Sequence, residues 1–187
     1  MGVRCFVSVD IEDPGLLAAF GRVQDVLKST GADLKSVEAE NIHITVRFLG
    51  DVPESGVEGV AGVVRGIAFE PFSLEVKGVG VFPGLHRPNV VWAGLEGERL
   101  LEMLRLFTEL EGGLRRLGFE PERRGFEPHL TICRVRSGRN RQQLAEAVRG
   151  LADESFGELQ VRQMRLKKSV LTDSGPVYST LAESKSI

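Results

Sequence analysis

The chain is poor in cysteine. Its 187 residues include only Cys5 and Cys133, and neither belongs to a CxxC pair or to a Cys/His cluster with the spacing of zinc ligands. This scarcity argues against a small disulfide-stapled secreted domain and against a structural zinc site. We expect both side chains to be reduced thiols packed in strands. A disulfide between them stays an open alternative, because both residues could lie in one central region.

The chain also lacks an excess of charge of either sign and long apolar runs. Its 24 Lys and Arg residues against 26 Asp and Glu residues give a net charge of −2, so any contact with nucleic acid should be local. Residues 1–15 hold an apolar stretch of only about five residues before acids follow, too short for a signal peptide or a membrane span. We expect a cytoplasmic protein without membrane contact, and we expect a monomer.

The glycine pattern disfavours several enzyme classes. The 22 glycines are scattered and form neither GxGxxG nor GxxxxGK[ST], so no nucleotide-cradling loop is indicated. A GxSxG motif is missing too, which disfavours a serine hydrolase. With 42% hydrophobic and 27% charged residues the composition is that of an ordinary globular protein, and the length allows a large core.

Strand and helix signals follow one another in mixed order. Apolar residues at three- and four-residue steps predict helices, and runs rich in β-branched and aromatic residues predict strands. Helices are expected over residues 14–28, 53–68, 98–117 and 139–152. Strands are expected over residues 3–9, 43–50, 72–82, 89–94, 129–135, 157–172 and 176–184, with a turn at 173–176.

Local signals sharpen the helix ends. Asp13 before Pro14 predicts an N-cap with proline at the first helical position, and Asp51 before Pro53 repeats this arrangement. A pair of glycines at 112–113 costs the third helix roughly 1 kcal/mol each relative to alanine, so we expect a bend or break there. Each half of the chain offers a strand with a His-x-Thr element, then a helix and further strands. This weak duplication predicts an α+β fold of two lobes rather than a doubly wound parallel sheet.

Two segments carry the same polar pair inside an apolar strand: HITVRFLG at 43–50 and HLTICRVR at 129–136. Successive side chains of a strand point to opposite faces, so His43 and Thr45 share one face, opposite their aliphatic neighbours. His129 and Thr131 share a face in the same way. If the two halves pack about an approximate two-fold axis, the two pairs line one cleft.

Two opposed imidazoles suit in-line displacement at phosphorus. With unperturbed pKa values near 6.5, one can be the base that takes a proton from the attacking oxygen and the other the acid that gives one to the leaving oxygen. The threonine hydroxyls would donate to the non-bridging phosphate oxygens. Each acid or base typically contributes about 10²- to 10⁴-fold, so this chemistry requires neither a metal nor another cofactor.

A purely structural role explains one His-x-Thr motif better than it explains two. A single His-x-Thr element in a strand is usually structural, but here two copies contain two of the three histidines in the chain. The third, His86, lies in a turn-like segment without a threonine, and we expect it to be exposed. Two histidines without Cys, Asp or Glu at ligand spacing make a poor zinc site.

The sequence resembles the LigT-like RNA 2′,3′-cyclic phosphodiesterases, also called 2′-5′ RNA ligases, of the two-histidine phosphoesterase superfamily. The resemblance covers essentially the whole chain and lies in RCFVSVDI, NIHITVRFLGDV, RPNVVWAGL, FEPHLTICRV and LKKSVLTDSGPVYSTL. It implies one bilobal catalytic domain over residues 1–187. The implied fold has two antiparallel sheets flanked by helices around a central cleft, with a pseudo-two-fold duplication.

The resemblance also implies metal-independent hydrolysis of a terminal RNA 2′,3′-cyclic phosphate to a 2′-phosphate. His43 matches the family's proton donor to the departing 3′-oxygen, and His129 matches the base acting on water. Thr45 and Thr131 match the phosphate-binding threonines, and Arg134 falls on the phosphate-contacting arginine of the pattern HxTxxR. The expected partners are RNA 3′ ends with a cyclic phosphate, such as tRNA fragments, or small cyclic nucleotides.

Several points stay open at this level. Simple alternation places Arg134 on the face away from His129, so its strand must end, twist or bulge for Arg134 to reach the cleft. Arg47, Phe48 and Tyr178 are weaker candidates for holding RNA, and Phe48 has the parity of core side chains. One rival function is ligation of a cyclic phosphate end to a 5′-hydroxyl end, which the same acid–base pair permits. Another is a non-catalytic module that binds RNA ends or nucleotides.

Overall fold

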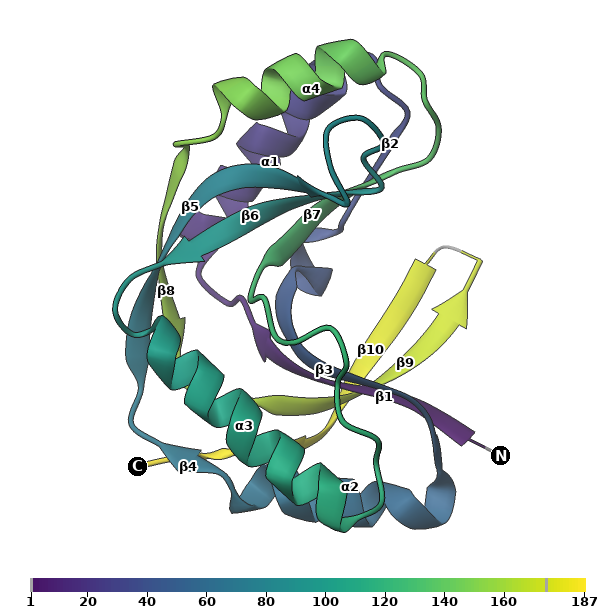
Figure 1. The fold of residues 1–187 in the computed structure, drawn as a ribbon, viewed down its shortest axis with the longest axis vertical. Helices are drawn as coiled ribbons and strands as arrows, with labels where there is room; N and C mark the ends of the chain where they lie inside the picture. The colour runs from purple at the N-terminus through teal and green to yellow at the C-terminus, as the bar shows by residue number, and fades with distance from the viewer. Residues whose placement is uncertain (1, 174) are drawn as a thin grey trace.

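The computed structural model describes residues 2–173 and 175–187, with helices at the top and bottom and strands between them (Figure 1). Its helices are α1 (Pro14–Ser29), α2 (Glu54–Gly66), α3 (Leu100–Arg116) and α4 (Arg141–Gly150), with a short 3-10 helix η1 (Ala39–Asn41). Its strands are β1 (Gly2–Asp10), β2 (Leu34–Ser36), β3 (His43–Pro53), β4 (Ala68–Phe69), β5 (Phe72–Phe82), β6 (Val90–Glu96), β7 (Leu130–Val135), β8 (Ser155–Val161), β9 (Arg165–Thr172), β10 (Gly175–Glu183) and β11 (Lys185–Ser186).

The strands that matter for the site belong to a 9-stranded antiparallel sheet. Its order is β10-β9-β1-β3-β7-β6-β5-β8, with β2 on β7, while β4 and β11 form a separate parallel pair. At the centre, β3 and β7 pair only between Ile44 and Leu130. This single pair joins a lower lobe (β10, β9, β1, β3) to an upper lobe (β7, β6, β5, β8), as Figure 1 shows. The two expected antiparallel sheets are therefore the two halves of one described sheet.

Each half of the sheet has two helices on its outer side. In the lower lobe α2 packs against β10, β3 and β9, and α3 packs on α2. In the upper lobe α1 packs against β8 and β7, and α4 packs against β5 and α1. The lobes interleave along the chain, because α1 follows a lower-lobe strand but covers the upper lobe, and β9 and β10 return to the lower lobe after β8. The expected α+β bilobal fold is confirmed, but its lobes are not consecutive halves of the chain.

Helix α1 begins and packs as its sequence predicts. The side-chain oxygen Oδ1 of Asp13 accepts a hydrogen bond from the backbone N–H of Leu16 at 2.8 Å, with Pro14 in the first turn. The apolar stripe of α1 is buried against the upper lobe. The second predicted cap is wrong, because Asp51 lies inside β3 and α2 begins after Pro53 without a side-chain cap bond.

Two other element predictions are corrected. Residues 157–172 do not form one strand, because β8 ends at Val161 in the upper lobe and β9 begins at Arg165 in the lower lobe. Helix α3 is not broken at its glycine pair. A Cβ atom on Gly113 would stand 2.3 Å from Cγ1 of Val63, so this glycine allows α2 and α3 to approach closely. The predicted turn at 173–176 includes residue 174, which lies outside the described residues.

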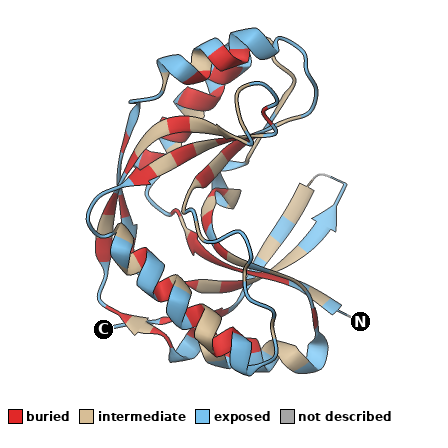
Figure 2. Cartoon of the chain, in the orientation of Figure 1, coloured by how far each residue is buried: buried red, intermediate tan, exposed pale blue. Residues whose placement is uncertain are grey.

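Buried residues lie on the helices and strands of both lobes (Figure 2) and form one hydrophobic core cluster. Cys5 in β1 and Cys133 in β7 are both buried in this core as free thiols, and their expected packing in strands is confirmed. Burial raises the pKa of Cys133 to about 11 and also raises the pKa of Cys5. Both thiols are therefore protonated at neutral pH and poor nucleophiles.

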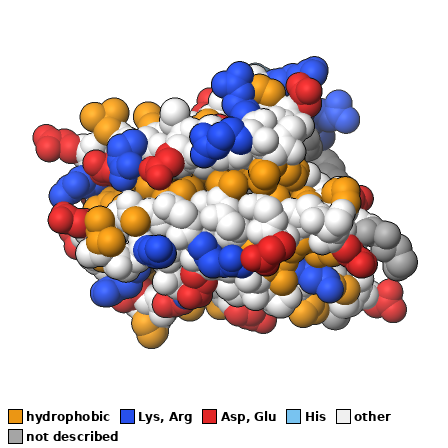
Figure 3. Space-filling view, turned by 90° about the horizontal axis from the view of Figure 1, so that it is seen from below, with side chains coloured by type: hydrophobic (Ala, Val, Ile, Leu, Met, Phe, Trp, Pro, Cys, Tyr) orange, Lys and Arg blue, Asp and Glu red, His pale blue; other side chains and the backbone are white. Residues whose placement is uncertain are grey.

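The surface agrees with a nearly balanced charge. Figure 3 shows the underside of the molecule, where acidic and basic side chains are intermixed around apolar ones. Within residues 2–173 and 175–187, no helix has both the length and the apolar character that a bilayer crossing requires.

Candidate active site

The five predicted site residues line one pocket of about 460 Å³ between the lobes. The lower lobe contributes His43 and Thr45 from β3, and the upper lobe contributes Thr131 and Arg134 from β7, with His129 just before this strand. The pocket continues along β2 and along the start of β10. The structure thus brings together residues that lie 86 positions apart in the sequence.

Strand register explains why the two motifs face each other. The bridging side chains of Ile44 and Leu130 are fully buried, so the residues on either side of them point to the opposite face, toward the cleft. In an antiparallel pair, the residue before one partner stands opposite the residue after the other. Each histidine therefore stands opposite the threonine of the other motif. The predicted sharing of faces is confirmed for both motifs.

Both histidine rings are held by the same device. Nδ1–H of His43 donates to the backbone carbonyl of Asn41 at 2.8 Å, and Nδ1–H of His129 donates to the carbonyl of Glu127 at 2.7 Å. In each case the acceptor is two residues before the histidine. A proton held at Nδ1 leaves Nε2 as the nitrogen that can exchange a proton in the cleft. Nε2 of His43 lies 3.0 Å from the hydroxyl oxygen of Thr45, which can donate to it when the ring is neutral.

Aromatic rings fix the imidazoles from the side. The ring of His43 lies 5.0 Å from Phe6 and 5.7 Å from Tyr178, centroid to centroid. The histidine of the second motif lies 5.0 Å from Phe82 and 6.4 Å from Trp92. Each imidazole therefore has two aromatic neighbours from its own lobe, which restrict its rotation and limit its contact with water.

Charged groups around His43 act in opposing directions. Burial lowers the pKa of His43 below its ordinary value, because the charged ring loses hydration. The backbone acceptor and the carboxylate of Asp10 favour the charged ring, whereas the cations Lys167 and Arg134 disfavour it. Asp10 stands opposite His43 in the β1–β3 register, and Lys167 donates a hydrogen bond to the Asp10 carboxylate. The free site therefore favours a neutral His43 at neutral pH.

A β-bulge follows the threonine in both motifs. The extra residue is Val46 in β3 and Ile132 in β7. A bulge shifts the alternation of the residues beyond it. Arg134 is thereby returned to the cleft face and lines the pocket, which confirms the irregularity that its strand required. Phe48 is shifted in the same way, since it pairs with Phe6 and its side chain is 45% exposed. The predicted core parity of Phe48 is wrong.

The other candidates differ in their positions. Tyr178 lines the pocket. Arg47 does not, because its guanidinium is paired with Glu111 and Glu122 on the far side of β3. His86 is exposed in its loop, as predicted.

Sequence reasoning missed the supporting groups of the site. Alternation along β1 places Phe6 and Asp10 on one face, but the sequence alone does not tell which face meets the histidines. The carbonyl acceptors at 41 and 127 carried no signal, since every residue has a carbonyl group. Within the described parts of the chain, no three His, Cys, Asp or Glu side chains are grouped as a metal site would require.

Comparisons with known proteins agree with this architecture. A family model described as LigT like Phosphoesterase matches residues 10–92 and again residues 98–178. A Methanothermobacter thermautotrophicus protein named RNA 2′,3′-cyclic phosphodiesterase is 40% identical over 183 residues, which is 97% of each chain. A protein of the same name from Aeropyrum pernix is 39% identical over 170 residues, covering 91% of this chain and 96% of that protein.

Solved structures show the same fold. Protein TT0787 of Thermus thermophilus is 26% identical, with a TM-score of 0.79 over 96% of both chains. The apo form of E. coli LigT is 20% identical, with a TM-score of 0.75 over 98% of both chains. The two successive matches of the family model fall on the two segments that contain the His-x-Thr motifs, and they confirm the resemblance found in those motifs. The chain belongs to the LigT-like phosphoesterase family.

Proposed function

We propose that this protein hydrolyses RNA 2′,3′-cyclic phosphate ends to 2′-phosphomonoesters, without a metal ion. The observation that carries this proposal is the convergence of two His-x-Thr pairs on one pocket, each histidine with Nδ1 anchored and Nε2 available. Relatives that are 39 to 40% identical bear the name of this activity. The whole chain would act as a single bilobal catalytic domain.

In the proposed reaction, water attacks phosphorus opposite the 3′-oxygen, the bond from phosphorus to the 3′-oxygen breaks, and the 2′-phosphate remains. Nε2 of His129 takes a proton from the water, and Nε2–H of His43 gives one to the departing 3′-oxygen. Thr45 and Thr131 donate hydrogen bonds to the non-bridging oxygens. Arg134 adds a positive charge with a fork of donors where negative charge builds up.

In this assignment His43 must be protonated to act as the acid. Burial, however, lowers the pKa of His43 in the free site. A bound phosphate brings negative charge beside the ring and favours its charged form. Substrate binding would therefore help to charge the acid. With the roles exchanged, the lowered pKa would suit His43 as the base, and the leaving-group assignment would pass to His129.

The direct test is an assay with a 2′,3′-cyclic phosphate oligonucleotide in EDTA. We expect a 2′-phosphate product, and a rate reduced about 10²- to 10⁴-fold in His43→Ala and in His129→Ala. His86→Ala is the matched control, because this histidine is exposed and outside the pocket. A 3′-phosphate product, or near-normal rates in a motif variant that remains folded, would contradict the proposal.

The same protein and RNA substrate distinguish hydrolysis from two other functions. Ligation to a 5′-hydroxyl RNA uses the same base and acid in the same roles, with the 5′-hydroxyl in place of water as the nucleophile, so the product distribution is measured with such an RNA present. We expect hydrolysis to dominate because water is abundant. A non-catalytic binding module would hold the cyclic end tightly without turnover, although binding alone does not require a matched acid and base.

A further inference from the structure

The carboxylate of Asp10 is a close neighbour of His43 that lies outside the pocket. Asp10 ends β1 and pairs in register with His43 at the start of β3. Side chains directly opposite each other in an antiparallel pair have Cβ atoms about 4.5 to 5.5 Å apart. Among the described residues that line the pocket, His43 is included and Asp10 is not. Asp10 is therefore close to the imidazole without forming part of the surface that a ligand would meet.

Three donors hold the carboxylate of Asp10. Oδ1 accepts a hydrogen bond from the hydroxyl of Ser8 at 2.8 Å. Oδ2 accepts hydrogen bonds from Nη1 of Arg165 at 2.9 Å and from Nζ of Lys167. Burial alone would raise the pKa of Asp10, but these hydrogen bonds outweigh burial and hold the pKa below its ordinary value. Asp10 is therefore a fixed negative charge over the whole pH range in which a histidine titrates.

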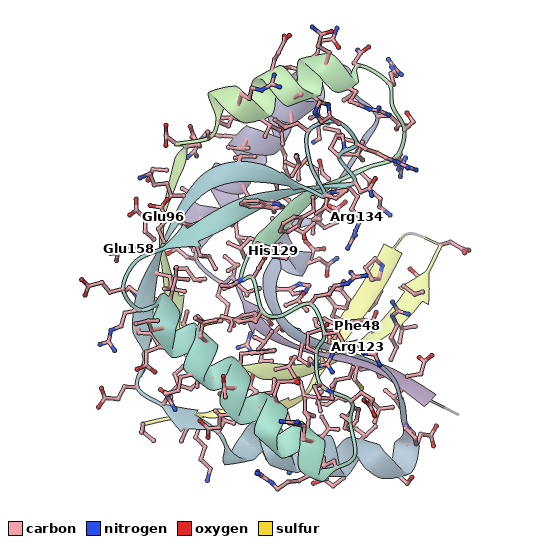
Figure 4. The ribbon with its side chains drawn as sticks, in the orientation of Figure 1. Phe48, Glu96, Arg123, His129, Arg134 and Glu158 are labelled. Carbon is pink, nitrogen blue, oxygen red and sulfur yellow. The ribbon has the colours of Figure 1, made fainter. Side chains whose placement is uncertain are left out.

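Asp10 opposes both burial and two cations at His43. Burial lowers the pKa of His43 most, the Asp10 carboxylate raises it, and Lys167 and Arg134 lower it by smaller amounts than Asp10 raises it. Arg134 lies on the upper lobe, on the other side of the cleft from β3 (Figure 4). The other titratable side chains that line the pocket, within the described chain, are Lys35 on β2, Glu38 and Glu40 at η1, Tyr178 on β10 and His129.

The two acidic residues at η1 do not replace Asp10. Glu38 and Glu40 are exposed, and water and salt screen exposed charges much more than partly buried ones. The side chain of Asp10 is only 16% exposed. Asp10 is thus the principal negative charge acting on the ring of His43.

The second motif differs at the equivalent position. In the lower lobe, residues 8–10 of β1 pair in order with residues 45, 44 and 43. In the upper lobe, residues 92 and 93 of β6 pair with residues 131 and 130, so the same register places Gly94 opposite His129. A Cβ atom on Gly94 would stand 2.6 Å from the backbone carbonyl oxygen of Lys77, so this position excludes a side chain. A carboxylate therefore stands beside His43, and no side chain stands at the matching place beside His129.

We propose that Asp10 is a positioning residue of the active site, whose carboxylate supplies the fixed negative charge that favours the protonated form of His43. Lys167 limits the strength of this charge, because it partly neutralises the carboxylate. The difference between Asp10 and Gly94 prepares one histidine of the duplicated pair to be the acid. The inference rests on the proposed function for the reaction that this acid serves, whereas the link between Asp10 and His43 is a property of the free protein.

Protonation of His43 is measured first, by NMR titration of the imidazole signals in the free protein, because this measurement does not depend on turnover. The chain has only three histidines, so His86→Ala and His129→Ala are sufficient to assign the three sets of ring signals. We expect Asp10→Asn to move the titration midpoint of His43 to lower pH by roughly half to one pH unit. The expected change is below the range of about 1 to 3 pH units for a direct ion pair, because Lys167 and Arg165 already neutralise part of the carboxylate charge.

Lys167→Gln should move the midpoint of His43 to higher pH, because this variant removes a cation instead of an anion. General damage to the site would not give shifts of opposite sign, and the double variant of Asp10→Asn with Lys167→Gln should return the midpoint toward the wild-type value. Glu12→Gln is the matched control. Glu12 also pairs with Arg165, at 2.6 Å, but its side chain is 66% exposed, so the midpoint of His43 should stay unchanged.

Three results would overturn the inference: an unmoved His43 midpoint in Asp10→Asn, shifts of the same sign in Asp10→Asn and Lys167→Gln, or an equal shift in Glu12→Gln. Thermal unfolding of each variant separates these results from misfolding. Turnover is measured second, at pH 8, where Asp10→Asn should lower kcat/KM about 3- to 10-fold because the protonated fraction of His43 falls by that factor. Unchanged turnover with a shifted midpoint would refute the acid role of His43 in the proposed function instead, and the titration would still decide the role of Asp10.

Discussion

Replacing Arg47 tests whether this residue stabilises the fold or contacts the substrate. Nε of Arg47 donates to Glu111 at 2.6 Å, Nη1 donates to Glu122 at 2.9 Å, and Nη2 donates to the carbonyl of Glu120 at 2.7 Å. The side chains of Arg47 and Glu111 are 12% and 13% exposed. This network joins β3 and α3 to the segment that leads into His129.

The cost of removing Arg47 follows from this burial. Arg47→Met keeps the aliphatic stem but leaves two carboxylates without their cation, and breaking a largely buried pair costs about 3 to 5 kcal/mol. For a chain of this size each kcal/mol lowers Tm by roughly 2 to 4 °C, so we expect a fall of roughly 6 to 20 °C. Arg47→Lys should recover only part of this stability, because lysine lacks the planar fork of donors.

Urea and thermal unfolding measure the effect. Arg65→Met is the matched control, because Arg65 pairs with Glu58 at the surface, where the side chains are 46% and 80% exposed. Surface pairs are worth about 0 to 1 kcal/mol. A loss below about 1 kcal/mol in Arg47→Met, or an equal loss in both variants, would refute the reasoning. Weakened RNA binding in a variant of unchanged stability would return Arg47 to the substrate contacts.

Two further predictions concern stability. The pKa of His43 is lowered in the folded state, so the unfolded state binds more protons between that value and the ordinary 6.5. The contribution of His43 to the free energy of unfolding is complete above pH 6.5 and is lost as the pH falls toward the pKa of the folded state. In urea unfolding at pH 7.5, 6.5 and 5.5, the wild-type protein should therefore lose stability relative to His43→Gln as the pH falls. A constant difference would contradict this. Gly113→Ala should destabilise the protein by about 1 to 2 kcal/mol, because the added Cβ atom crowds Val63. Gly112→Ala, with open space around it, should instead stabilise the protein by up to about 1 kcal/mol. Urea unfolding of both variants measures the two effects, and equal effects would contradict this explanation.

The sequence was informative where one short-range rule decides the structure. Alternation assigned the faces of His43 and His129 correctly, and the capping signal at Asp13 located the start of α1. The alternation rule failed at Phe48, because the bulge that reverses the alternation depends on pairing with β1. For Arg134 a known motif demanded an irregularity in the strand, and for Phe48 nothing did.

The arrangement of the lobes was beyond sequence reasoning for another reason. Residues 157–172 keep a strand-like composition across the break at 162–164, which contains neither glycine nor proline. Which lobe each strand joins is decided by partners far away in the chain, such as β5 for β8 and β1 for β9. The local composition of residues 157–172 does not indicate these long-range pairings.

The differences between the two motifs matter as much as their likeness. The histidines, the threonines, the Nδ1 anchors and the bulges are nearly equivalent in both lobes, so an acid–base pair of this kind could serve a phosphate in either orientation. A cyclic phosphate end is not symmetric, because an RNA strand leaves it on one side only. Position six breaks the equivalence, with the guanidinium of Arg134 in the upper lobe and the aromatic ring of Phe48 in the lower lobe. We therefore expect the duplicated residues to carry out the proton transfers and the unmatched position six to contribute to the direction in which the strand lies.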